Sequence, residues 1–133
     1  MAETAMLLIM QSHPLITERV PTTERNQIID VTPNVKRIVR QLNVNDGMVI
    51  VYVPHTTAAV TINENADPDV KSDFLKKLSA MIPHRESYYD HNEGNSDSHV
   101  KTALVGNSAT VLIEHGNEAR HDNDGLAMHL PPL

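Results

Sequence analysis

The chain has very few aromatic side chains from which to build a core. It contains one Phe, three Tyr and no Trp among 133 residues, although 40% of its residues are hydrophobic. We therefore expect a core of aliphatic side chains, within a single domain long enough to fold without disulfide bonds. The absence of cysteine excludes disulfides, thiolate nucleophiles, thiolate zinc sites and iron–sulfur clusters.

The charge balance of the chain disfavours some classes of binding partner. The chain has 11 Lys and Arg against 17 Asp and Glu, a net charge of −6. This balance argues against nucleic acids and anionic membranes as partners. No apolar run can span a bilayer and no signal peptide is recognisable, so we expect a cytoplasmic protein. No glycine-rich phosphate loop is present, and no organic cofactor is indicated.

Hydrophobic patterning predicts a β-rich α+β domain with two main helices. The strands are expected at residues 5–13, 26–31, 48–53, 58–63 and 109–114, and the run at 48–53 is apolar enough to be buried on both faces. The helices should begin at Thr32-Pro33 and Asp67-Pro68, where each first residue acts as N-cap. Their apolar stripes are expected to face the core, and a short third helix is expected at 99–105. The main stripes are Val35, Ile38, Val39 and Leu42, and Val70, Phe74, Leu78 and Met81.

The first polar group follows the strand at 48–53. His55 could serve as a metal ligand, a general base or an oxyanion donor, since functional side chains are commonly placed at strand ends. The alternative is a capping histidine beside two threonine hydroxyls, Thr56 and Thr57, that turn the chain.

The second polar group, residues 63–69, spans the end of a strand and the start of a helix. Acidic residues suit the positive end of a helix dipole, and this accounts for Asp67. Glu64 ends the strand instead, which makes a general-base role plausible.

The third polar group lies in residues 89–99, within a polar loop at 84–98. His91 and His99 are eight residues apart, with Glu93 and Asp97 between them. Neutral imidazoles bind zinc and similar ions, and a carboxylate can orient a bound ring. The alternative is a solvated surface loop. Five other histidines are interpreted as surface or tail residues: His13, His84, His115, His121 and His129.

Residues 55–58, 62–70 and 91–101 together closely resemble the signature segments of the YjbQ family, which is linked to secondary thiamine-phosphate synthase activity. The resemblance covers residues 5–116. It implies a β-sandwich-like domain with two main flanking helices, residues 1–116, assembled as a homotrimer. Residues 117–133 depart from the family pattern, and we expect a divergent tail that lacks the family's final strands. Such a loss would expose a sheet edge and place trimer formation in question.

The resemblance also implies the residues of a pocket near subunit contacts. A divalent metal, zinc or magnesium, would bind to His55, His91 and His99. Catalytic roles would fall to Glu64 as general base, His55 and Asp97. The substrate-binding residues would be Thr56, Asn63, Asn65, Asp69, Glu93 and Asn95.

Two classes of function follow. In the first, the protein is a small-molecule enzyme that acts on a phosphate or pyrophosphate ester and resembles a thiamine-phosphate synthase. In the second, the same pocket binds a metal or small ligand without turnover. A third interpretation is a family member inactivated by its altered C-terminus.

Overall fold

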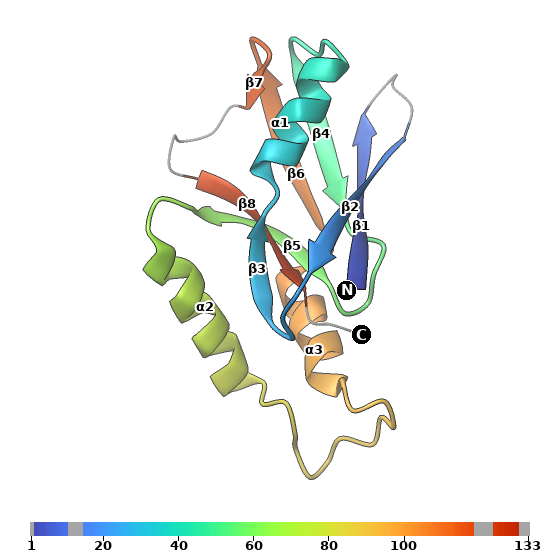
Figure 1. Ribbon diagram of the computed structural model, residues 1–133, viewed down its shortest axis with the longest axis vertical. Coiled ribbons are helices and arrows are strands. Elements are labelled where there is room, and N and C mark those ends of the chain that lie inside the picture. Colours follow the sequence, from blue (N-terminus) through green and yellow to red (C-terminus); the bar gives the residue numbers. More distant parts are fainter. Residues whose placement is uncertain (1, 11–14, 119–123, 131–133) are drawn as a thin grey trace.

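In the part of the chain that the structure describes, two antiparallel sheets are packed with three helices (Figure 1). The computed structural model describes residues 2–10, 15–118 and 124–130, and the side chains of residues 15–116. The first sheet holds, in spatial order, β2 (Ile16–Thr22), β1 (Ala2–Met10), β4 (Gly47–Tyr52), β6 (Ser108–Glu114) and β7 (Asn117–Glu118). The second sheet holds β3 (Gln27–Asp30), β8 (Asp124–Leu130) and β5 (Ala59–Glu64). The predicted α+β class and single domain are confirmed.

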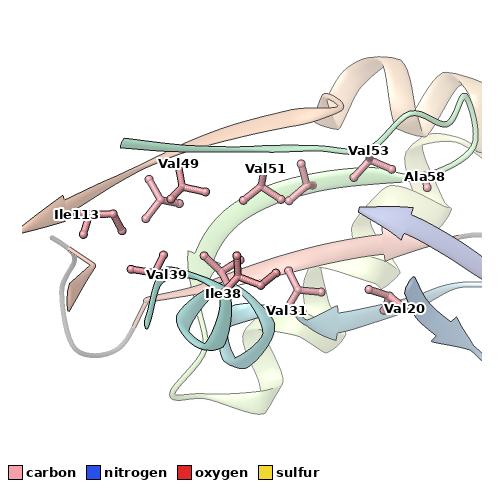
Figure 2. Close-up of a cluster of buried hydrophobic side chains, with 12 residues drawn as sticks. Val20, Val31, Ile38, Val39, Val49, Val51, Val53, Ala58 and Ile113 are labelled. Carbon is pink, nitrogen blue, oxygen red and sulfur yellow. The ribbon is translucent and has the colours of Figure 1, made fainter. Parts of the chain in front are cut away.

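The core is aliphatic, as the composition requires. The helix α1 (Thr32–Gln41) directs Val35, Ile38 and Val39 into it, each no more than 2% exposed. Val49 and Val51 of β4 belong to the same core cluster, and Figure 2 shows them opposite Ile38 and Val39. The predicted stripe of α1 is therefore confirmed, and α1 closes the space between the sheets.

The two helix starts differ in how their backbone donors are satisfied. The helix α2 (Pro68–Met81) has the predicted cap, because the Asp67 carboxylate accepts a 2.9 Å hydrogen bond from the Asp69 N–H. The prediction that Thr32 caps α1 is wrong. Val31 occupies the cap position, and the Asp30 carboxylate accepts a 2.9 Å bond from the Thr32 N–H. The capping carboxylate thus comes from the last residue of β3.

Two burial predictions are wrong in part. The strand predicted at 48–53 forms as β4, but only one face is buried, and Met48 is 47% exposed on the other. Antiparallel sheets are commonly covered on one face only. A continuous apolar run such as 48–53 does not reveal this, because apolar residues occupy both faces of the strand. In α2, Leu78 is buried, whereas Met81 is 58% exposed at the end of the helix.

One strand was not predicted from the sequence, and the predicted bounds of other elements differ from those in the structure. β2 was missed, and its Pro21 fits its position at a sheet edge, where a ladder donor is dispensable. The helix α3 (Ser96–Val105) starts three residues before the predicted 99. β1 ends at Met10, and predicted strand positions 11–13 lie outside the described residues. No helix in the described ranges is both long and apolar enough to cross a membrane.

The C-terminal stretch, expected to lack the family's final strands, contains β7 and β8. β8 pairs with β3 through four residues and with β5 through six. It is therefore the central strand of the second sheet. The edge that we expected its loss to expose is occupied in the structure.

Candidate functional site

Two histidines from different elements line one hollow of about 350 Å³. His55 and Thr56 come from the turn that follows β4. His99 and Thr102 come from α3, and Asn107 follows α3 directly. Both imidazoles are partly buried. The hollow therefore offers two groups that exchange protons and several that form hydrogen bonds, around a space large enough for a small molecule.

Backbone hydrogen bonds fix the walls of this hollow. The Val53 N–H donates to the Asn107 carbonyl at 2.8 Å, and the Val60 N–H donates to the Gly106 carbonyl at 3.0 Å. The end of α3 is thereby attached to both β4 and β5. The His55 N–H donates to the Val53 carbonyl at 2.8 Å, which tightens the turn that carries the imidazole.

Gly106 makes this junction possible because its φ is +99°, a region that side chains disfavour. A Cβ at this position would meet no atom within 4 Å, so substitution would strain the backbone alone. We expect Gly106→Ala to lower the free energy of unfolding by about 1–2 kcal/mol. Urea denaturation measures this loss, and unchanged stability would show that the junction tolerates an ordinary residue.

A second hollow of about 350 Å³ lies on another side of His99, lined by His91, Ser96, His99 and Val100. The rings of His91 and His99 have centroids 5.3 Å apart and are nearly perpendicular, at 79°. The His91 Nε2 also lies 3.5 Å from the exposed Glu93 carboxylate. His99 is thus common to both hollows, while His55 and His91 each line only one.

The three predicted metal ligands do not form one ligand set in the structure. Among the residues whose side chains are described, no three His, Asp or Glu groups are placed to hold a metal ion. The donor set of a single chain therefore does not fit a three-histidine centre. The zinc or magnesium ion stays a prediction.

Asp97 lies at the centre of a buried ion-pair cluster. Its carboxylate is fully buried, and Lys101, only 2% exposed, donates to it at 2.8 Å. Arg25 donates to both oxygens, at 2.9 and 3.1 Å, and the His84 Nδ1 lies 3.3 Å away. His84, interpreted as a surface residue, thus contacts a buried charge. The cluster joins α3 to the β2–β3 connection and to the loop after α2.

This arrangement suits Asp97 to holding α3 in position, and the catalytic role predicted for it stays a prediction. Burial is the largest influence and raises its pKa, but hydrogen bonds from Arg25, Lys101 and His84 outweigh it. The pKa of Asp97 is therefore held well below its usual value. A carboxylate so stabilised neither accepts nor releases a proton near neutral pH. It anchors the first turn of α3 two residues before His99.

The other predicted residues lie at the far end of β5. Glu64 and Asn63 are exposed, and the Glu64 N–H donates to the Asn63 side chain at 2.8 Å. Asn65 donates to Asp30 at 2.9 Å and accepts from Lys71 at 2.7 Å, while the exposed Asp69 lies in the first turn of α2. The Val60 N–H bonds to the Gly106 carbonyl at the histidine hollow, and Glu64 lies four residues further along β5, about 13 Å away at ~3.3 Å per residue.

One chain therefore divides the predicted pocket in two. His55, Thr56 and His99 share a hollow, and His91 borders His99. Glu93 and Asn95 form a long 3.5 Å contact near His91. The carboxylate and amide groups of residues 63–69 stand apart from all of these. Sequence reasoning missed Asn107, Thr102 and Arg25, because none has a local signal.

Comparison with known proteins now identifies the family. A family model described as "UPF0047 protein YjbQ-like" matches residues 17–127. The chain belongs to the YjbQ-like UPF0047 family. The match continues past residue 116 and reaches into β8, so the family pattern extends into the stretch predicted to diverge.

Family relatives resemble this chain over most of their length. The UPF0047 protein MJ1081 of Methanocaldococcus jannaschii is 45% identical over 102 residues, 77% of this chain and 73% of that protein. The UPF0047 protein YugU of Bacillus subtilis is 41% identical over 77% of each chain. A solved YjbQ/UPF0047 structure from Clostridium acetobutylicum has a TM-score of 0.81 and 42% identity, covering 84% of this chain and 85% of that one.

Proposed function

We propose that the protein is a small-molecule enzyme that uses His55 and His99 for proton transfer. The observation that carries the proposal is that these two imidazoles, from separate elements, line the same hollow. Histidine is the side chain most often used for proton transfer near neutral pH. A protonated imidazole would donate to the leaving oxygen of a substrate while the neutral one accepts a proton elsewhere.

The substrate class of the proposal is a phosphate or pyrophosphate ester. The family resemblance supports a thiamine-phosphate synthase-like transfer, in which a pyrimidine pyrophosphate joins a thiazole phosphate and releases pyrophosphate. Thr56, Thr102 and Asn107 line the hollow beside the imidazoles, and their side chains would orient such a substrate through hydrogen bonds. No metal step is included, because the side chains described for residues 15–116 do not bring three ligands together.

Glu64 can serve as the general base only if a second copy brings it to the hollow. Within one chain it is exposed and lies at the opposite end of β5 from His55. The proposed homotrimer would meet this requirement if each site combined the histidines of one copy with Glu64 of the next. The family resemblance supports the homotrimer. The separation of Glu64 from the histidine hollow within one chain supports a site that two copies share.

Subunit mixing tests this proposal. We expect His99→Gln and Glu64→Gln each to reduce thiamine phosphate formation about 100-fold or more, because each removes a proton-transfer group. When the two inactive variants are co-refolded in equal amounts, random assembly should restore activity in roughly a quarter of the shared sites. Co-refolded His99→Gln with His55→Gln, both on the histidine side, is the matched control and should stay inactive.

The other outcomes distinguish the alternatives. Activity that does not return on mixing, with both variants folded, would contradict a shared site. A Glu64→Gln variant that turns over normally would remove the carboxylate from the mechanism. The absence of turnover in the wild type, with substrate still bound, would favour a binding module, which is consistent with a hollow that no carboxylate of the described residues lines.

A further inference from the structure

Basic side chains are scarce in the signature segments but gather on α1. Lys101, the one basic residue in the segment of residues 91–101, is buried against Asp97 and unavailable to a ligand. By contrast, α1 carries Lys36, Arg37 and Arg40 and contains no acidic residue. In a chain of net charge −6 this is a local reversal of sign.

These three side chains line a hollow of about 400 Å³, which Asp30 and Asn65 also line. Lys36 and Arg40 are four residues apart and so lie on one face of the helix. Arg40 forms no ion pair with any residue whose side chain the structure describes. Like charges brought together around a cavity repel, and an anion between them would relieve that repulsion.

The acidic groups near this hollow are already engaged. Glu18 accepts from Asn34 at 2.9 Å and from Arg37 at 2.7 Å, and these bonds hold the pKa of Glu18 below its usual value. One Asp30 oxygen accepts from the Thr32 N–H and the other from the Asn65 side chain, at 2.9 Å each. Lys71 donates to Asn65 at 2.7 Å, so a further positive charge lies next to the hydrogen-bonded pair of Asn65 and Asp30.

We infer that this hollow is an anion site that binds the phosphate group of a small molecule. Arginine presents a planar fork that matches phosphate oxygens, and lysine adds a compact charge. The volume admits a pyrophosphate or a small phosphorylated compound. The site lies at the Asn65 end of β5, away from the histidine hollow, so it is a second site within each chain and does not require turnover at the first.

Isothermal titration with inorganic pyrophosphate at constant ionic strength tests the inference. Wild-type protein should bind, and the double variant Lys36→Gln with Arg40→Gln should bind at least ten-fold more weakly. Glutamine keeps helix propensity, so α1 should remain folded. The matched control is Lys76→Gln with Lys77→Gln, which removes two exposed charges from α2 and should leave the affinity within two-fold of wild type.

The remaining variants separate this inference from the proposed function. The variant His55→Gln with His99→Gln should keep the pyrophosphate-binding event that the α1 double variant loses, even if its turnover and any binding at the histidine hollow are lost. The inference is overturned if wild-type protein binds no pyrophosphate at millimolar concentration. It is also overturned if the α2 double variant loses as much affinity as the α1 double variant, because binding would then follow overall charge.

Discussion

Replacing Asp97 with asparagine is expected to lower the free energy of unfolding by about 3–5 kcal/mol. The substitution leaves Lys101, 2% exposed, as a buried cation without its carboxylate, and it also releases Arg25. Removing one partner of a buried pair costs far more than removing an exposed one. Urea denaturation monitored by circular dichroism gives the change directly.

The matched control is Asp73→Asn, which breaks the exposed pair with Lys76 at 3.3 Å on α2. We expect this variant to lose less than 1 kcal/mol. The two variants should also differ in how their free energy of unfolding depends on pH in acid, because only the Asp73→Asn variant keeps the Asp97 carboxylate. Because the folded pKa of Asp97 lies below the unfolded value of about 3.9, its contribution is present above that value and is lost as the pH falls through the folded value. A variant at Asp97 as stable as the control would contradict the role of the cluster.

Deleting residues 119–133 is expected to abolish cooperative folding. This deletion removes β8, which is the central strand of the second sheet and the strand that both β3 and β5 pair with. Without it, two strand edges and the side of the core that they cover would be open to water and to other chains. Thermal melting should show no sharp transition, and size-exclusion chromatography should show aggregates.

A chain that ends at residue 130 retains β8 and is the matched control, expected to melt cooperatively like the full chain. The prediction fails if the chain that ends at residue 118 remains monodisperse and melts with the same midpoint. That result would mean that the first sheet and α1 support the domain alone.

Local chemistry explains which parts of the fold were predictable. Pro33 and Pro68 mark two helix starts because proline suits the first turn. β4, β5 and β6 were found because they are rich in β-branched residues. β8 was missed since only Leu126, Met128 and Leu130 alternate in it and it has no β-branched residue. Its pairing with β3 and β5 is what fixes it as a strand, and such pairing leaves no local signal.

The candidate site was predictable in composition but not in arrangement. His55 and Glu64 lie nine residues apart in the sequence, yet β5 separates them, because His55 precedes the strand and Glu64 is its last residue. His99 reaches His55 because Gly106 and Asn107 attach α3 to two strands, a contact between distant segments. The pair of Asp97 and Lys101 has helical spacing and could have been predicted, whereas Arg25 lies 72 residues from Asp97.

The most direct test of the central claim is the rate of thiamine phosphate formation when each imidazole of the hollow is removed. We expect His55→Gln and His99→Gln each to reduce kcat by about 100-fold or more while stability is unchanged. The control is His115→Asn, which removes an exposed imidazole at a positive φ that asparagine tolerates, and it should match the wild type. Wild-type rates in both hollow variants would contradict the assignment of proton transfer to His55 and His99.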